Sequence, residues 1–201
     1  MKRGACAFQE VAALHLVRQH ISIPVPFVLD MVGEYFIMTG LCGEPLGTVF
    51  SEMQPDEMAR VRELLSEFVH QLRAIPNDAP GVVSGPYHYM PCCDVNRVDE
   101  YQFGPFTSVA AFHSYLLSIN PPQHREKITN AAKGVHAKPH TVYFTHGDLN
   151  LRNILVEDGR VTGIVDWTFA GWYPGYWELG KAVICPPAIQ EVAGFLGNHF
   201  T

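Results

Sequence analysis

The chain has 201 residues and a formal net charge of −6, with 47% hydrophobic and 17% charged residues. This size and composition predict one folded domain, or one lobe with part of another, and exclude a disordered chain. The negative charge, together with the lack of any run of Lys and Arg, argues against a nucleic-acid backbone as the main partner.

The N-terminal part predicts a helix followed by a hairpin. Apolar residues recur at broadly helical spacing over residues 8–20, and the two prolines of ISIPVP then enforce an extended segment. Residues 27–32 and 34–39 are strand-like and are joined by a short turn at Gly33. The following TGLCGEPL contains two glycines, which predict a chain reversal at a hinge.

The middle of the chain is predicted to be helical around one long loop. The clearest helix spans 55–75, where apolar residues recur at i, i+3, i+4 and i+7. Residues 76–103 are rich in Pro, Gly and Asn and predict a long surface loop. Further helices are expected over 107–119, over 123–135 and, near the end, over 187–197.

A second hairpin is predicted within FTHGDLNLRNILVEDGRVTGIVD, residues 144–166. Strand-like residues 153–157 and 160–165 flank an Asp-Gly pair, which is favoured chemistry for a tight hairpin turn. The apolar run VYF precedes the His-Gly-Asp turn.

This hairpin carries an acid, an amide and a second acid. Asp148 follows the VYF strand, where its carboxylate can accept a hydrogen bond from a substrate hydroxyl and hold it in line with phosphorus. Asn153 supplies a neutral oxygen and Asp166 a charged one, both suited to magnesium. Each residue alone would most often be a turn or capping residue. Together they predict phosphoryl transfer.

The sequence shows no pattern of a membrane span, of a secretion signal or of a cysteine-based site. No apolar run approaches the roughly 18 residues of a membrane span, and no apolar signal region precedes Gln9 and Glu10. The cysteine count is odd and no C-x-x-C pair occurs. We therefore expect reduced thiols in a cytoplasmic protein, rather than a disulfide framework or a zinc site, at the following positions: Cys6, Cys42, Cys92, Cys93 and Cys185.

The stretch HGDLNLRNILVEDGRVTGIVDWTFAGWYPGYWELGKA (146–182) resembles the core of the aminoglycoside phosphotransferase / choline-kinase-like family, a branch of the protein-kinase-like fold. The similarity extends upstream through QEVAALHLVRQHISIPVPFVL (9–29), YFIMTGLCGEPL (35–46) and GPFTSVAAFHSYLL (104–117), a pattern typical of fungal members. Only the first block is highly specific.

The resemblance implies an α+β fold in two parts. Residues 1–39 would form a partial β-rich N-terminal lobe containing a strand, a helix and a hairpin. Residues 40–201 would form a mainly helical C-terminal phosphotransferase lobe with a catalytic β-hairpin, and the nucleotide would lie between the lobes. The Gly-rich phosphate loop and the last helices of the family have no counterpart, so we expect a member shortened at both ends.

The resemblance also implies the cofactors ATP and Mg²⁺ and a role for individual residues. Asp148 would be the catalytic base, with Asn153 and Asp166 as magnesium ligands. Structural support would come from His146, which braces the turn by hydrogen bonding near Asp166, from Gly147, which replaces the Arg of protein kinases, and from Glu178. A solvent-facing position is the alternative for Glu178, and Lys181 is expected at the surface.

On the nucleotide side, Lys2 would pair with Glu10 to grip the phosphates, although a Lys after an initiator Met is also common for unrelated reasons. Met38 resembles a gatekeeper that lines the adenine pocket. Thr39 and Leu41 would then offer backbone groups to the adenine edge.

The function predicted from these features is ATP- and Mg²⁺-dependent phosphate transfer to a hydroxyl of a small molecule, with no nucleic-acid or membrane partner. The missing phosphate loop motivates an alternative, a catalytically inactive pseudokinase-like binding or scaffold protein. A metal-dependent hydrolase using Asp148, Asp166 and His146 is a weaker third hypothesis, because it does not account for the hinge. The acceptor is left open among aminoglycosides, choline-like amines, sugars and other alcohols.

Overall fold

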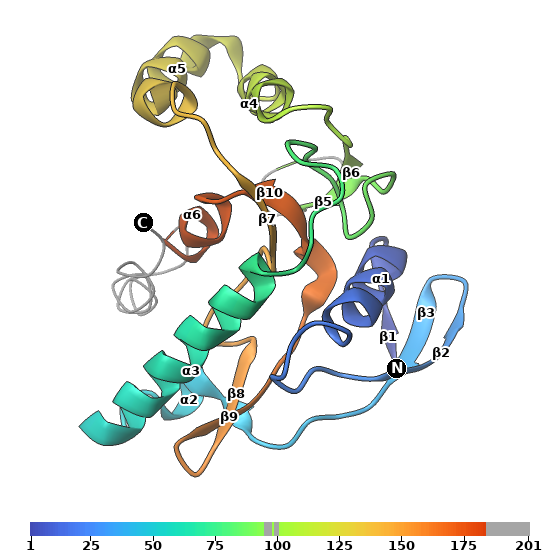
Figure 1. Ribbon diagram of the computed structural model, residues 1–201, viewed down its shortest axis with the longest axis vertical. Helices are drawn as coiled ribbons and strands as arrows, with labels where there is room; N and C mark the ends of the chain where they lie inside the picture. Colours follow the sequence, from blue (N-terminus) through green and yellow to red (C-terminus); the bar gives the residue numbers. More distant parts are fainter. Residues whose placement is uncertain (95–97, 99–100, 184–201) are drawn as a thin grey trace.

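The N-terminal part of the chain is a small antiparallel sheet packed against one helix (Figure 1). In this computed structural model, which describes residues 1–94, 98 and 101–183, the sheet has the order β1 (Lys2–Arg3), β3 (Tyr35–Met38), β2 (Val28–Val32). Helix α1 (Ala7–Val17) lies beside it. Lys2 is directly opposite Phe36, which is fully buried, so both side chains belong to the sheet face that α1 covers. The predicted helix and hairpin are confirmed.

A connecting segment leads to the longest helix. It contains the short strand β4 (Glu44–Pro45) and the single-turn helix α2 (Leu46–Val49), neither of which was predicted. Helix α3 (Pro55–Arg73) confirms the prediction for this region, and a capping box between Gln54 and Glu57 fixes its start. Its apolar side contacts the C-terminal strands through Val61, Leu65, Phe68, Val69 and Leu72.

The segment predicted as a surface loop, residues 76–103, is in part buried, and that prediction is wrong. Strands β5 (Cys92–Cys93) and β6 (Gln102–Phe103) pair within it. Val83 and Ser84 are completely buried, and their backbones form bridges to Phe106 and Trp172. Proline and glycine content indicated irregular backbone but not where that backbone would lie.

Two cysteines that were predicted to be reduced thiols are joined. Cys6, before α1, and Cys93, on β5, form a disulfide with a Cα–Cα distance of 6.5 Å, which lies within the range such a bond requires. They are 87 positions apart, so no spacing in the sequence could indicate the pairing. Cys42 is free and exposed, and Cys92 is free and buried. Cys185 lies outside the described residues.

Helices α4 (Val109–Ser118) and α5 (Pro122–His136) pack against each other at the top of Figure 1, and both lie close to their predicted bounds. The side chain of Ser108 caps α4 by accepting a hydrogen bond from the amide of Ala111. The helix predicted over 187–197 lies outside the residues that the structure describes.

The second predicted hairpin is present. Strand β8 (Ile154–Glu157) pairs with β9 (Arg160–Ile164) and, on its other edge, with β4. Asp158 and Gly159 occupy the turn with φ of 50° and 68°, the positive values that a type I′ turn requires.

Two further strands form a separate sheet. Strand β7 (Val142–Thr145) pairs with β10 (Gly171–Pro174). Strand β10 was not predicted. The hairpin is followed by a 3₁₀ turn, η1 (Trp167–Phe169). Strand β10 is followed by α6 (Trp177–Val183), the last helix that the structure describes. Within the described ranges, no helix combines the length and apolar character needed to cross a membrane.

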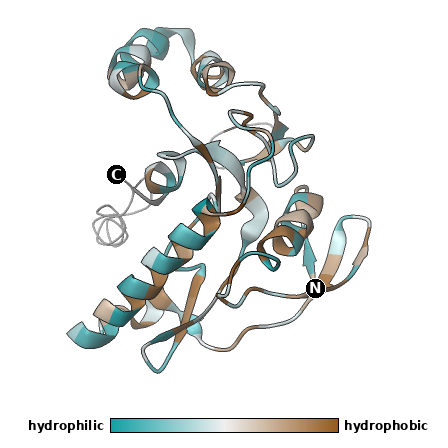
Figure 2. Cartoon of the chain, in the orientation of Figure 1, coloured by the Kyte–Doolittle hydropathy of each residue, from teal (hydrophilic) through white to brown (hydrophobic). Residues whose placement is uncertain are grey.

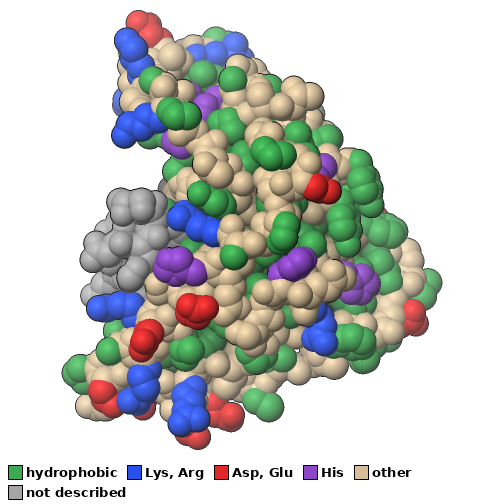
Figure 3. All heavy atoms as spheres, viewed as in Figure 1, with side chains coloured by type: hydrophobic (Ala, Val, Ile, Leu, Met, Phe, Trp, Pro, Cys, Tyr) green, Lys and Arg blue, Asp and Glu red, His purple; other side chains and the backbone are tan. Residues whose placement is uncertain are grey.

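The core is continuous from α1 through α3 to the C-terminal strands. Trp167 lies at its centre with no exposed surface and meets Phe68 of α3 edge to face at 5.9 Å. Figure 2 shows α3 with hydrophilic and hydrophobic residues on different sides, as expected for a helix half covered by a sheet. On the face shown in Figure 3, Lys and Arg alternate with Asp and Glu around one end of the molecule and form no large basic patch.

Candidate active site

The turn after β7 is held by one buried carboxylate. Glu178 of α6 is 3% exposed, and its oxygens accept hydrogen bonds from the backbone amides of His146 (2.6 Å), Gly147 (3.2 Å) and Leu149 (3.3 Å). Burial raises the pKa of Glu178, and the hydrogen bonds from these amides offset part of that increase. This carboxylate therefore orients the backbone on both sides of Asp148.

Gly147 permits the turn to pass against the end of η1. Its φ is +78°, and a Cβ built at this position would lie 2.3 Å from the backbone oxygen of Phe169. No side chain can occupy this position without moving backbone.

His146 is fully buried and braces the turn from the other side. Its Nε2 donates to the backbone oxygen of Val165 at 3.0 Å, and its Nδ1 accepts from the amide of Asp148 at 3.2 Å. These two partners select the neutral imidazole with a proton on Nε2. Burial lowers the pKa of His146 to about 4. The ring also packs edge-on to Trp167, 4.6 Å away.

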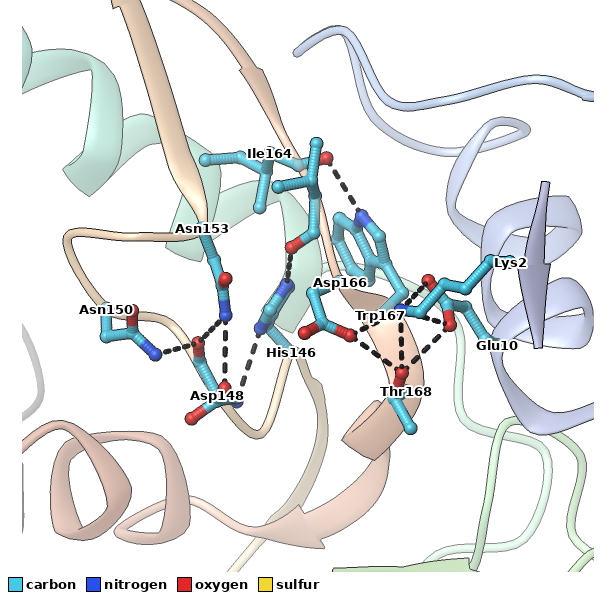
Figure 4. Close-up of polar contacts among 11 residues, drawn as sticks. Lys2, Glu10, His146, Asp148, Asn150, Asn153, Ile164, Asp166, Trp167 and Thr168 are labelled. Carbon is cyan, nitrogen blue, oxygen red and sulfur yellow. Dashed lines mark hydrogen bonds and ion pairs between the residues drawn. The ribbon is translucent and has the colours of Figure 1, made fainter. Parts of the chain in front are cut away.

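Asp148 and Asn153, five positions apart, are in direct contact (Figure 4). The Asn153 Nδ2 donates to Asp148 Oδ2 at 3.1 Å and to its backbone oxygen at 2.9 Å. Asn150, which sequence reasoning missed, donates to the same backbone oxygen at 3.0 Å. Burial raises the pKa of Asp148, while the charge of Lys181 and the hydrogen bond from Asn153 counteract the rise. A half-buried carboxylate in this state is suited to accepting a proton.

A second cluster forms around Asp166, which follows β9 in the left-handed region with φ 63° and ψ 64°. Lys2 Nζ lies 2.7 Å from Asp166 Oδ1 and 2.7 Å from Glu10 Oε2, and it joins β1, α1 and the end of β9. The Thr168 hydroxyl completes the cluster. Burial opposes the charge on Lys2, but Glu10 and Asp166 raise its pKa. Burial likewise opposes the charge on Asp166, yet hydrogen bonds from Lys2 and Thr168 lower its pKa.

Two side-chain oxygens of the site lack a protein partner among the described residues. Every contact of the Asp166 carboxylate uses Oδ1, and every side-chain contact of Asn153 uses Nδ2. Asp166 Oδ2 and Asn153 Oδ1 therefore remain for a ligand, and oxygen donors of this kind fit Mg²⁺. The described ranges contain no group of three His, Cys, Asp or Glu that could hold a metal on its own. Magnesium fits such a site because it uses few protein ligands together with phosphates and water.

A cavity of about 260 Å³ adjoins the charged cluster and is lined in part by Lys2, Glu10, Asp166 and Thr168. The cavity gives a ligand access to the charges that join the small sheet to the larger part of the molecule.

The residues predicted to contact adenine lie at the end of β3 and just beyond it. Met38 is half-buried at the edge of the core. The Thr39 amide already donates to the Phe27 backbone oxygen at 2.9 Å, so its carbonyl is the backbone group left for a base. Leu41 packs on Gly163, where a Cβ would lie 2.3 Å from Leu41 Cδ1. The same Cβ would also lie 2.9 Å from the backbone oxygen of Pro24, which cannot move aside as a leucine side chain can, so the hairpin needs glycine at this position.

Lys181 was expected at the surface, and that prediction is wrong. Its side chain is 4% exposed, and Nζ lies 2.7 Å from Oδ2 of the equally buried Asp94 and 5.0 Å from the ring centroid of Phe169. Asp94 is 87 positions away in a segment predicted as surface loop, so no sequence pattern indicated the pair.

The sequence profile of the phosphotransferase enzyme family (APH) matches residues 5–197. No curated protein matches the chain.

Several solved structures share its fold. A thermostable mutant of aminoglycoside phosphotransferase APH(4)-Ia, in complex with ADP and hygromycin B, is 17% identical, with a TM-score of 0.62 over 96% of this chain and 67% of that one. Macrolide 2′-phosphotransferase MphH from Brachybacterium faecium is 24% identical, with a TM-score of 0.60 over 96% and 64%.

The gentamicin complex of APH(2″)-IIa is 14% identical, with a TM-score of 0.66 over 99% of this chain and 68% of that one. The chain therefore spans about two thirds of the length of these structures. They confirm the predicted α+β, protein-kinase-like fold.

Proposed function

The chain belongs to the phosphotransferase enzyme family, and on this premise we propose that it transfers phosphate from ATP, with Mg²⁺, to a hydroxyl group of a small molecule. The observation that carries the proposal is that a base, two side-chain oxygens without a partner among the described residues, and a Lys–Glu pair lie around Asp166 and η1 (Figure 4). Phosphoryl transfer needs positioning and charge stabilisation more than covalent help, and this set of groups supplies both.

In this proposal Asp148 is the base. Its carboxylate accepts a hydrogen bond from the acceptor hydroxyl and takes the proton as the oxygen attacks phosphorus. The hydrogen bond from Asn153 fixes the direction of the carboxylate, and Glu178 fixes the backbone beneath it. Burial raises the pKa of the Asp148 carboxylate, and a more basic carboxylate accepts a proton more readily.

The metal and nucleotide would be held on the other side of the site. Asn153 Oδ1 and Asp166 Oδ2 would bind Mg²⁺, which when bound neutralises charge on the transferred phosphate. Lys2, oriented by Glu10, would contact the phosphates. Met38, with backbone groups of Thr39 and Leu41, would border the base. The nucleotide would then lie between residues 1–39 and the larger remainder.

The alternative of a binding or scaffold protein without catalysis is less well supported. Such a protein needs neither an oriented base nor vacant metal ligands, yet the Asp148–Asn153 contact and the free oxygens are both present. The relatives of known structure are named as phosphotransferases, and two of them are complexes with hygromycin B or gentamicin. Hydroxyl-bearing small molecules of that kind are therefore the first acceptors to test.

The test is Asp148→Asn, with Asp158→Asn in the exposed hairpin turn as the matched control. We expect the variant at 148 to reduce turnover on the order of 10³-fold, because general-base catalysis is lost. MgATP should still raise its melting temperature, and the control should match the wild type. Phosphate transfer would be measured by mass spectrometry over a panel of aminoglycosides, sugars, amino alcohols and macrolides.

Two results would contradict the proposal. Unchanged turnover in Asp148→Asn would remove Asp148 as the base. A wild-type protein with no thermal shift at saturating MgATP would favour the scaffold alternative.

A further inference from the structure

Thr168 is the one uncharged side chain in the cluster at the end of β9. Its Oγ1 lies 2.7 Å from Asp166 Oδ1, 2.8 Å from Glu10 Oε2 and 3.1 Å from Lys2 Nζ (Figure 4). One hydroxyl thus touches the predicted metal ligand and both members of the predicted phosphate-binding pair. Nothing in the residue type or its place in the sequence assigned it a role.

We propose that Thr168 is a positioning residue that orients the Asp166 carboxylate toward a bound metal–nucleotide. The inference rests on the proposed function, because it concerns how the same site becomes ready for Mg²⁺ and ATP.

The number of hydrogens in the cluster limits which contacts can form at one time. A threonine hydroxyl has one hydrogen to donate, yet Oγ1 lies at donor distance from a carboxylate oxygen of Asp166 and one of Glu10. The Lys2 ammonium has three hydrogens and contacts both acids as well as Oγ1. Whichever acid does not receive the hydroxyl hydrogen is still held by Lys2. While Lys2 contacts both acids, Thr168 can therefore redirect its hydrogen bond and the acid that it leaves is still paired.

The contacts of Asp166 would change when nucleotide binds. Asp166 is held only at Oδ1, and only by Lys2 and Thr168 among the described residues. In the proposed function Lys2 turns toward the phosphates, so its hold on Asp166 weakens when the metal must bind. Thr168 then becomes the main contact that keeps Oδ1 in place and leaves Oδ2 directed at the metal.

Thr168 itself is held firmly by its neighbours in the chain. It lies in η1 between Trp167, which is completely buried, and Phe169, which is 9% exposed. These two aromatic side chains anchor the backbone that carries the hydroxyl, whereas the Asp166 side chain is 45% exposed. A fixed donor beside a more exposed carboxylate restricts the rotamers of the carboxylate.

A purely structural role would have a different effect. The hydroxyl also links η1 to α1 through Glu10, and loss of that link alone would lower the stability of the free protein without changing how nucleotide binding depends on magnesium. The decisive measurement is therefore the gain in affinity for a non-hydrolysable ATP analogue when Mg²⁺ is added, determined by titration calorimetry.

Four proteins would be compared: the wild type, Thr168→Val, Thr168→Ser and the control Thr162→Val. Val keeps the shape of Thr and removes the hydroxyl, and Ser keeps the hydroxyl. Thr162→Val removes a hydroxyl that donates to the Cys42 backbone oxygen at 2.6 Å, away from the charged cluster. We expect Thr168→Val to reduce the magnesium-dependent gain about tenfold, as for one lost hydrogen bond to a charged group. Thr168→Ser and Thr162→Val should keep the wild-type gain, even if the melting temperature falls.

The inference is overturned if Thr168→Val keeps the full gain, or if Thr168→Ser loses as much as Thr168→Val. Should Thr168→Val fail to fold, Thr168→Ala is measured in its place against the same criteria. A wild-type protein that binds no nucleotide at all would instead refute the proposed function. If the wild type binds nucleotide and Thr168→Val keeps the same magnesium-dependent gain, the role of Thr168 is refuted and the proposed function is not.

Discussion

The two sides of the candidate active site are held together by different forces. The turn around Asp148 depends on buried hydrogen bonds, with Glu178 accepting from three amides and a neutral His146 bridging to Val165. The cluster around Asp166 depends on charges that are partly exposed. We call the first the catalytic turn and the second the charged cluster.

The two sides also differ in how far along the chain their partners lie. The catalytic turn is built within the last third of the described chain, where the largest separation, between His146 and Glu178, is 32 positions. The charged cluster joins Lys2 to Asp166 across 164 positions. Damage to the first should therefore affect folding of the turn and catalysis. Damage to the second should affect the junction with the small sheet, and with it the nucleotide and metal.

We expect the largest loss of stability from Gly147→Ala in the catalytic turn. A positive φ and a Cβ 2.3 Å from the Phe169 backbone oxygen should lower the free energy of unfolding by roughly 3 to 4 kcal/mol. Urea denaturation measures the loss. The matched control is Gly134→Ala in α5, where a Cβ meets nothing within 4 Å and should stabilise the protein by about 0.5 kcal/mol or more. A loss at 147 no larger than 1 kcal/mol would show that the turn can move, and that its geometry is not fixed by packing.

The corresponding change in the charged cluster is Glu10→Gln. Glu10 is 2% exposed, and neutralising it leaves the part-buried Lys2 with one charged partner, Asp166, among the described residues. We expect the free energy of unfolding to fall by about 2 kcal/mol, less than for a fully buried pair because Lys2 keeps some contact with water.

Calorimetry on Glu10→Gln should also show weaker binding of the ATP analogue, which Gly134→Ala should not. Asp56→Asn, which breaks the exposed Asp56–Arg60 pair of α3, is the control for the loss of charge itself and should change neither quantity measurably. Equal stability in Glu10→Gln and Asp56→Asn would mean that the cluster adds nothing to the junction.

The same difference in separation explains what the sequence could predict. The hairpin of β8 and β9 was predicted correctly because an Asp-Gly turn acts locally, and the contact of Asp148 with Asn153 follows from a spacing of five. The positions of Lys2 and Glu10 came only from the family resemblance. No local pattern in the chain places Lys2 beside Asp166.

What the sequence could not show are contacts between segments far apart that have no characteristic residue pattern. The Lys181–Asp94 pair and the Cys6–Cys93 disulfide both cross 87 positions and end in a segment whose composition indicated a surface loop. Strand β10 was missed because Gly and Pro weaken a strand pattern, and its pairing with β7 compensates for that only in the folded chain. Thr168 acquires two of its three charged neighbours, Lys2 and Glu10, only when β1 and α1 are in place.

The catalytic turn and the charged cluster should lose their contributions to stability in different pH ranges. His146 is neutral in the folded protein, since its Nδ1 must accept from the Asp148 amide and burial lowers its pKa to about 4. In the unfolded chain the same group takes up a proton near its ordinary pKa of about 6.5. The unfolded state then binds more protons, so the stability from this group is complete above about pH 6.5 and is lost as pH falls toward 4.

Between about pH 7.5 and 5 this group alone should lower the free energy of unfolding by about 2 kcal/mol. His113, whose pKa is also lowered to about 4, by burial and by the charges of His136 and His140, acts over the same window, so the wild-type slope contains both contributions. The variant His146→Gln should therefore give a shallower slope in urea denaturation than the wild type, whatever its absolute stability. Asp166 of the charged cluster responds in another window, because its pKa is lowered and its contribution is lost only as pH falls below the ordinary range of a carboxyl, whereas burial raises the pKa of the neighbouring Glu10. If His146→Gln and the wild type lose stability in parallel down to pH 5, the imidazole is not held neutral, and the catalytic turn would depend on charge as the other side does.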